Sequence, residues 1–274
     1  MIDPANIEHE PIQSSGSYKA WALGDGKPAV VDLAWRSKSD HARPETHHLL
    51  PFTEPSIALR RRFARSGATL DWDFVIFRAR PDGGIYDPEP GEELFALRLA
   101  PEAMESGLRM KATEHLEADS EVPQPLLTAL DDVARHADQQ RFEMAWRVML
   151  ATICGHADGL EVDRISAAAG LARRSEGVLA PTQLAQHAGI SARHMRRGFV
   201  DRFGLSPRGV LRRQRLTSAM LAAEKREQPN WADLAAEHNF SDQPHMIREA
   251  RALTGQSPGE WHRQRRGMAV SFNT

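Results

Sequence analysis

The sequence has little cysteine and no long apolar run. Its 274 residues include a single cysteine, Cys154, which excludes an intramolecular disulfide and a zinc site built from several thiolates. No apolar run approaches the roughly 20 residues that cross a bilayer, and the N-terminal MIDPANIEHEP lacks the basic and then apolar profile of a signal peptide. We therefore expect a cytoplasmic protein without a membrane partner.

Charged residues are unevenly divided along the chain. The formal net charge is only -2, but residues 160–274 contain 18 Lys and Arg against 11 Asp and Glu, and residues 1–159 contain 17 against 26. The C-terminal part is thus basic and the N-terminal part acidic. This polarity favours an anionic partner, nucleic acid above all, for the C-terminal part, although a solvated surface would carry the same charge.

The first hundred residues are predicted to form a partly buried sheet. Short apolar runs bounded by Gly and Pro clusters are typical of strands, and they lie at residues 29–35, 73–80 and 93–100. Phe95, Leu97 and Leu99 share one face of a strand, with Ala96 on the other. The continuous apolar run at 74–77 predicts burial on both faces.

Polar and helical segments flank this predicted sheet. Residues 1–17 are expected to form a loose polar arm, and Pro101 opens a short helix. From Pro125 the apolar residues follow a helical period, which predicts two helices that pack on each other as a bridge between domains, with a subunit interface as the alternative. The two apolar faces are Leu126, Leu127, Leu130, Val133 and Ala134, and Phe142, Ala145, Trp146, Met149 and Ile153.

The C-terminal part contains a repeated segment. HMRRGFVDRFGLSP begins at His194, and HMIREARALTGQSP begins at His245, 51 residues later. Each copy follows a short helical stretch and a turn, at Gly189 in the first copy and at Asn239 in the second. Two helices joined by such a short turn form the helix-turn-helix pattern.

Capping residues and a linking helix complete the repeat. Ser191 is placed as the N-cap of the second helix in the first unit, and Ser241 or Asp242 has this place in the second. Between the units, Pro207 to Lys225 has no internal breaker apart from Gly209, and it predicts a helix of roughly 27 Å. Such a spacer can separate two recognition helices by about 34 Å, one turn of B-DNA. The chain could then read two successive major-groove segments.

These features resemble the DNA-binding domain of the AraC/XylS family of bacterial transcription regulators. The segment from about Leu160 to Arg266 carries the resemblance through LAQHAGIS, HMRRGF, FGLSP, RRQRLTSAML, LAAEHNFSDQPHM and TGQSPGEW. Two units, a long linking helix and two G-x-S-P turns are together a specific combination. The resemblance implies an all-α C-terminal domain that binds double-stranded DNA.

The resemblance also implies which side chains bind DNA in the first recognition helix. They are Arg193, His194, Arg196 and Arg197. The three arginines would face base edges, where arginine can bond guanine in a bidentate manner, and His194 would lie near phosphate. A solvated helix face is the alternative, but Met195 marks the opposite side of the helix as core.

The corresponding residues of the second recognition helix are less basic. They are Gln243, Pro244, Ile247 and Arg248. Gln243 and Arg248 could read bases, whereas Pro244 and Ile247 offer only apolar contacts, for example to a thymine methyl group.

The second unit departs from the family pattern. Asn239 stands in place of the usual glycine of the turn, and Ala250 in place of the usual aromatic residue. We therefore expect the second unit to bury less, to hold DNA more weakly and to specify less sequence. The resemblance makes Arg215 of the linking helix a structural ion-pair residue, and the basic stretch at 262–266 could contact phosphates or fray.

The N-terminal half offers weaker indications. THHLLPFTEPSIALRR and ELFALRLAPEAMESGL resemble the N-terminal domain of a subset of AraC-like regulators, which implies that it senses a ligand or mediates dimerisation. The aromatic residues Trp21, Trp35, Trp72, Phe74 and Phe77 could line an apolar pocket or pack in the core. The cluster Asp40, His41, His47 and His48 suggests a metal site or a polar loop. Its spacing places no three ligands on one rigid element, so we expect no metal and no cofactor.

The sequence thus predicts a multidomain α+β protein with a β-rich N-terminal sensor or dimerisation domain at 1–120, a helical bridge at 121–159 and an AraC-type DNA-binding domain at 160–274. The expected partner is double-stranded DNA, with RNA polymerase, a small-molecule effector and a second copy of the chain as further candidates. Whether the protein activates or represses stays open.

Three other functions were weighed against this prediction. A DNA-repair protein with a metal-bound methyl acceptor requires a cluster of thiolates, which one cysteine cannot supply. A serine hydrolase has no nucleophile elbow to support it, so we expect no enzyme. A regulator that acts mainly by protein contact, with a degraded second DNA-binding unit, is the remaining alternative, because Ile247 and Ala250 weaken the second unit's DNA pattern.

Overall fold

The computed structural model describes residues 13–15, 18–22, 31–42, 46–77, 79, 81–104, 128, 148–149, 151–153 and 162–270. Cys154 and most of the predicted helical bridge lie outside these residues. The chain divides into two units. The first contains Met1–Glu45, Glu54–Arg78 and Asp87–Ser166, and the second contains Thr46–Thr53, Ala79–Tyr86 and Ala167–Thr274.

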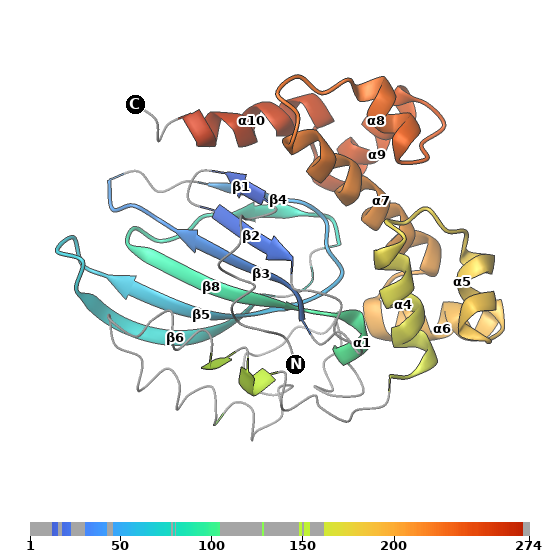
Figure 1. The fold of residues 1–274 in the computed structure, drawn as a ribbon, viewed down its shortest axis with the longest axis horizontal. Coiled ribbons are helices and arrows are strands. Elements are labelled where there is room, and N and C mark those ends of the chain that lie inside the picture. Colours follow the sequence, from blue (N-terminus) through green and yellow to red (C-terminus); the bar gives the residue numbers. More distant parts are fainter. Residues whose placement is uncertain are drawn as a thin grey trace. The chain divides into compact units, whose positions relative to one another are not determined.

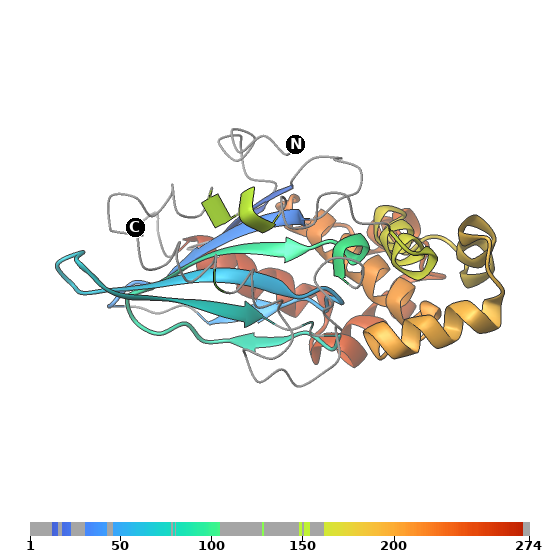
Figure 2. The ribbon, with the colours of Figure 1, turned by 90° about the horizontal axis from the view of Figure 1, so that it is seen from below.

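The first unit contains a six-stranded antiparallel sheet. Its strands are β1 (Gln13–Ser15), β2 (Tyr18–Ala22), β3 (Val31–Lys38), β5 (Ser56–Phe63), β6 (Thr69–Phe77) and β8 (Glu92–Leu99). They lie side by side in the order β1-β2-β3-β8-β5-β6 (Figure 1 and Figure 2), and the short helix α1 (Pro101–Met104) follows β8. The predicted β-rich N-terminal half is confirmed. Gln13–Ser15, predicted as part of a loose arm, pairs with β2 instead.

Strand β8 is the buried centre of the sheet. It lies between β3 and β5, and Ala96 is as fully buried as its neighbour Leu97. The run at 74–77, predicted to be buried on both faces, is only half-buried because β6 is the edge strand. That prediction was wrong because a continuous apolar run does not distinguish a central strand from an edge strand.

The tryptophans of the sheet do not line one pocket. The strand register places Trp35 on one face and Trp72 on the other, together with Phe74. Trp35 packs edge-on against Phe77, with ring centroids 5.4 Å apart. The side chain of Trp21 lies outside the part that the structure describes. Trp35 and Phe77 therefore pack together within one face of the sheet, as in an ordinary core.

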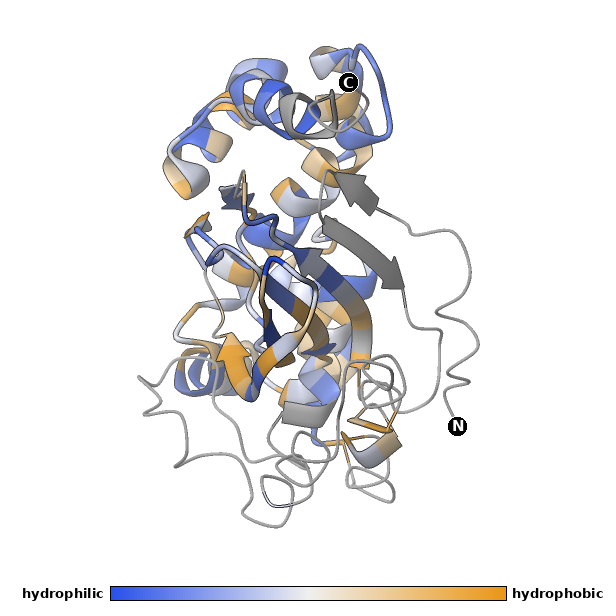
Figure 3. Ribbon diagram, turned by 90° about the vertical axis from the view of Figure 1, so that its left-hand side faces the viewer, coloured by the Kyte–Doolittle hydropathy of each residue, from blue (hydrophilic) through white to orange (hydrophobic). Residues whose placement is uncertain are grey.

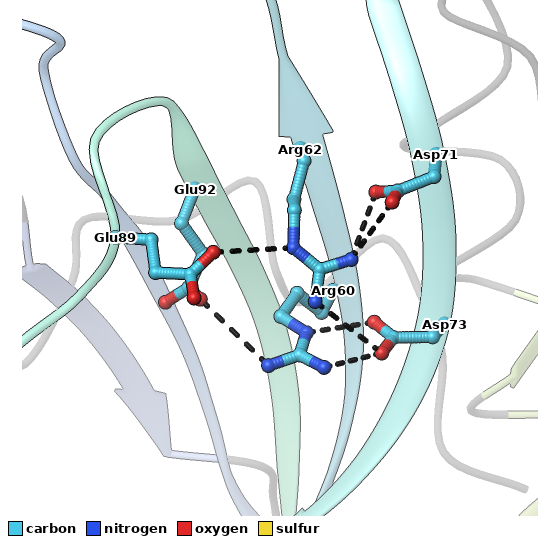
Figure 4. A network of polar contacts seen from close by, with 6 residues as sticks. All are labelled: Arg60, Arg62, Asp71, Asp73, Glu89 and Glu92. Carbon is cyan, nitrogen blue, oxygen red and sulfur yellow. Dashed lines mark hydrogen bonds and ion pairs between the residues drawn. The ribbon is translucent and has the colours of Figure 1, made fainter.

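Ion pairs gather at one end of the sheet, on both faces. On one face the network consists of Arg60, Arg62, Asp71, Asp73, Glu89 and Glu92 (Figure 4). The hydrogen bond to Asp71 raises the pKa of Arg62. On the other face Glu93 is completely buried and accepts hydrogen bonds from Arg36 and Arg61. The two guanidinium groups offset the cost of burying this carboxylate.

The histidines that suggested a metal site have other contacts. His41 packs edge-on against Phe63, with ring centroids 5.3 Å apart, and His47 stacks on Tyr86 in the paired strand. Among the residues described, no group of three or more His, Cys, Asp or Glu could hold a metal ion. The same part of the chain contains no helix that is long and apolar enough to cross a membrane.

The second unit is helical apart from a two-stranded ribbon. The helices are α4 (Arg164–Arg174), α5 (Pro181–Ala188), α6 (Ala192–Phe203), α7 (Pro207–Glu224), α8 (Trp231–Glu237), α9 (Gln243–Thr254) and α10 (Pro258–Val270), with α4 beginning at the boundary between the units. Most of these helices show hydrophilic and hydrophobic stripes (Figure 3). The ribbon pairs β4 (His47–Leu49) with β7 (Gly84–Tyr86). The residues of the ribbon lie in the β-rich half of the sequence, but they belong to the same compact unit as the helices.

Candidate nucleic-acid interface

The first helix-turn-helix unit consists of α5 and α6. Leu184 of α5 and Met195 and Phe199 of α6 are buried against the rest of the unit. Gly189 ends α5 with a φ of 61°, in the left-handed region where glycine has no Cβ to clash. The predicted pair of helices and its glycine turn are confirmed.

The outer face of α6 is basic. Arg193, His194, Arg196 and Arg197 are all exposed and lie in the first half of the helix. Because Met195 is 1% exposed and points into the core, the arginines project from the opposite side. The structure thus brings the predicted residues of the first unit together on one accessible surface.

The second helix-turn-helix unit consists of α8 and α9. Asn239 lies in the turn with a φ of 57°, so it adopts the left-handed conformation that the sequence required of it. In α9, Pro244 and Arg248 are exposed, whereas Gln243 and Ile247 are half-buried. Four predicted residues therefore share the start of one helix, but they present a smaller and less basic surface than those of α6.

Capping residues begin both recognition helices. The hydroxyl of Ser191 accepts a hydrogen bond from the backbone N–H of His194 at 3.1 Å. In the second unit the carboxylate of Asp242 accepts from the N–H of His245 at 2.6 Å, so Asp242 rather than Ser241 is the N-cap. Each cap satisfies one of the N–H groups that a helix leaves free at its start.

The second helix-turn-helix unit has a buried core that contains Ala250. Ala250 is completely buried in a cluster with Leu216, Ala219, Met220, Ala235, Phe240, Met246, Leu253 and Trp261. Trp261 of α10 is 1% exposed and supplies the aromatic volume that Ala250 lacks. An aromatic side chain of this core thus comes from the next helix, α10, and not from α9 itself.

Arg251 extends the exposed face of α9 and was missed in the sequence. It is exposed and lies one turn beyond Arg248. The helical period could have revealed it, since Arg251 lies three positions after Arg248 and therefore shares its face of the helix.

The linking helix α7 has 18 residues and is continuous, as predicted. In Figure 1 it runs from the α5–α6 pair to the α8–α9 pair. Arg212 forms an ion pair with Glu249 of α9. Arg215 instead lies 4.9 Å above the ring of Phe240 and donates a hydrogen bond to the carbonyl of Asn239, while burial lowers the pKa of Arg215. The structural role expected of Arg215 is present, but the ion pair to α9 belongs to Arg212.

The basic stretch at 262–266 is part of α10. His262 contacts the carbonyl of Arg226 at 3.1 Å, and Arg265 forms a largely buried ion pair with Glu224 at 2.6 Å. Arg263 is exposed. Of this stretch, Arg263 is therefore the best placed to meet a phosphate.

Comparisons with known proteins agree with this geometry. A family model described as a helix-turn-helix domain matches residues 184–264. That span begins in α5 and ends in α10, so it contains both units and the linking helix. Residues 184–264 of this chain therefore match a helix-turn-helix domain, as the sequence predicted. The resemblance found in the sequence is confirmed, and the chain carries the DNA-binding module of transcription regulators.

Several solved structures are similar to the chain, with low identity. A transcriptional regulator with an AraC-type DNA-binding domain from Chromobacterium violaceum is 23% identical over 37% of this chain and 91% of its own, with a TM-score of 0.35. ToxT from Vibrio cholerae O395 is 7% identical over 92% of this chain and 99% of its own, with a TM-score of 0.45. ToxT from strain SCE256 with a bound unsaturated fatty acid is 9% identical over 91% and 96%, with a TM-score of 0.40. No curated protein sequence matches the chain significantly.

Proposed function

We propose that this protein regulates transcription by inserting α6 and α9 into two successive major-groove segments of its operator. The observation that carries the proposal is the pair of exposed recognition helices joined by one 18-residue helix. A helix of this length spans roughly 27 Å, and with its turns it suits two grooves about 34 Å apart.

In the first major-groove segment, the arginines of α6 recognise the DNA bases. Arg193, Arg196 and Arg197 are exposed and can each bond guanine O6 and N7. His194 lies at the start of the helix, where a phosphate would also meet free backbone N–H groups. This unit therefore contributes most of the specificity.

In the second segment, α9 reads fewer base edges. Gln243 and Arg248 supply the polar contacts, and Pro244 and Ile247 supply apolar ones. The dense packing around Trp261 supports a working second unit over the alternative of a degraded one that acts by protein contact. Its smaller basic surface supports weaker sequence preference.

The acidic N-terminal half receives the signal or joins two copies of the chain. Its six-stranded sheet belongs to a different unit of the chain from the helices, whereas the ribbon belongs to the helical unit. A small-molecule effector, RNA polymerase and a second copy are the partners that this arrangement suits. The role is that of a binding protein and not of an enzyme, and the DNA partner implies action in the cytoplasm of a bacterial cell.

The test is selection of binding sites from random duplex DNA by the full chain, followed by footprinting at two salt concentrations. The expected site has two preferred boxes one helical turn apart, with the box read by α6 more strongly enriched. A single box would show that the second unit only holds the backbone. Absence of any enrichment would contradict the proposal and favour regulation through protein contact.

A further inference from the structure

The β4–β7 ribbon is attached to the linking helix α7. The hydroxyl of Thr217 donates a hydrogen bond to the carbonyl of Pro51 at 2.8 Å, just beyond β4. Arg213, which is 9% exposed, donates to the carbonyl of Pro81 and forms an ion pair with Asp82 at 2.7 Å, just before β7. Both strands of the ribbon are therefore attached to α7 at the same end of the ribbon, through two residues that lie about one helical turn apart.

The ribbon also reaches the end of α9 and the core beneath it. Leu50 packs against the cluster that contains Met246 and Leu253 of α9. Gln256, which follows α9, lies with its amide nitrogen 3.3 Å from Nδ1 of His48. A Cβ atom on Gly83 would lie 3.4 Å from the carbonyl oxygen of Leu253, so the ribbon turn approaches the α9 backbone closely.

The ribbon contact uses a place where the two units differ in sequence. Gln256 occupies the position that Leu205 has in the first G-x-S-P turn. The second turn thus offers a polar side chain to the ribbon where the first offers an apolar one. The contacts of Gln256, Arg213 and Thr217 therefore place the ribbon against the second helix-turn-helix unit and α7.

From these contacts we infer that the ribbon is a positioning element of the second recognition helix, so that it sets the affinity for the second DNA box. This inference rests on the proposed function. Packed helices shift as units when one side of their support changes. Loss of the ribbon contacts therefore displaces α9 without removing any side chain that faces DNA.

The ribbon also links the two halves of the chain covalently. Pro51 is followed within a few residues by β5, and Pro81 comes shortly after β6, so both ribbon segments continue into strands of the sheet. A signal that alters those two strands acts directly on the residues that hold α7 and α9. The ribbon is therefore the route by which the N-terminal half modulates the second box.

The test compares binding to the two boxes separately. The full chain and its Thr217→Val variant are titrated with the duplex selected above and with versions in which either box is scrambled. Thr217→Val removes the hydrogen bond to Pro51 at nearly constant volume, and it is expected to weaken second-box binding about fivefold to tenfold, the equivalent of one hydrogen bond. Thr217→Ser restores the hydroxyl and is expected to bind as the unmodified chain does. Ser218→Ala, which removes the adjacent hydroxyl on α7, is the matched control.

Several outcomes separate this inference from general loss of structure. First-box affinity and the salt dependence of binding are expected to be unchanged in Thr217→Val, since no phosphate contact is lost. Arg213→Met is expected to act in the same direction. Equal loss at both boxes, or wild-type binding by both Thr217→Val and Arg213→Met, would overturn the inference while leaving the proposed function intact. If the unmodified chain selects no two-box site, the proposed function itself fails.

Discussion

The imidazole of His238 lies 3.7 Å from the carboxylate of Glu176, measured from Nδ1 to Oε2. His238 is the residue that ends α8 in the second unit, and Glu176 lies in the turn that follows α4. The pair therefore connects the turn after α4 to the second helix-turn-helix unit, formed by α8 and α9. Burial lowers the pKa of His238, although Glu176 opposes this shift.

This lowered pKa predicts a loss of stability in acid. The unfolded chain binds a proton at His238 more readily than the folded chain does, so the unfolded state is favoured as the pH falls below about 6.5. Above that pH, the contribution of His238 to the free energy of unfolding is fully present. Urea unfolding at pH 7.5 and 5.5 should show a lower midpoint at pH 5.5, with a smaller difference in His238→Gln. The exposed His187 provides the control, and an equal effect of His187→Gln would contradict the assignment to His238.

Arg196→Ala and Arg263→Ala should have different effects on DNA binding. Arg196 projects from α6, so its loss should relax specificity at one base pair and cost about 1 to 3 kcal/mol on the preferred sequence. Arg263 lies on α10, so its loss should weaken binding to all sequences and reduce the salt slope by about 1. Binding assays against single-base variants of the operator distinguish the two. Identical effects on every sequence would contradict the separate roles.

Trp261→Ala should destabilise the second unit by about 3 to 5 kcal/mol, because it empties the centre of a buried cluster. Trp231, which is only half-buried at the edge of the same cluster, is the natural comparison, and Trp231→Ala should cost clearly less. Chemical unfolding followed by far-ultraviolet circular dichroism measures both. A larger loss in Trp231→Ala would show that the cluster is centred elsewhere.

Removal of either N-cap should weaken its helix by about 1 kcal/mol. Ser191→Ala and Asp242→Ala test the two caps, and Ser191→Asn should retain stability because asparagine also caps well. Ser241→Ala is expected to have a small effect, since Asp242 accepts the capping bond. Thermal unfolding of the four variants decides this, and a larger effect at Ser241 than at Asp242 would reverse the assignment.

Glu93→Gln should destabilise the N-terminal sheet by about 3 kcal/mol, because Arg36 and Arg61 would lose the charge that they share. Asp71→Asn provides the contrast. It also removes a carboxylate paired with arginine, but Asp71 is 55% exposed, so the loss should be at most about 1 kcal/mol. Equal losses in an unfolding titration would mean that burial of Glu93 contributes nothing.

Local features of the DNA-binding domain could be predicted from the sequence. The turn at Gly189, the cap at Ser191 and the helix α7 depend on neighbouring residues, and the repeat strengthened the predictions of the turn and the cap. The exposed arginines of α6 followed from the buried positions of the same helix. These predictions held because helix periodicity and capping act over a few residues.

Features that depend on distant residues were missed. The volume beside Ala250 is filled by Trp261 from another helix, and the attachment of Pro51 to Thr217 joins residues 166 positions apart. The half-buried state of 74–77 depends on the place of β6 in the sheet. No local pattern contains this information, because partners in packing and strand order are chosen over the whole chain.

The unbroken helix α7 sets a rotation as well as a distance. In an α-helix each residue advances the chain by about 1.5 Å and turns it by about 100°. A single residue added between Arg213 and Leu216 would hardly change the separation of the two recognition helices, yet it would turn one of them away from the face of the duplex that both read in the proposed function. The rotation between the two recognition helices thus depends on the number of residues in α7 far more strongly than the distance between them does. In the proposed function, an insertion into α7 preserves binding to both boxes only if it adds close to a whole number of helical turns.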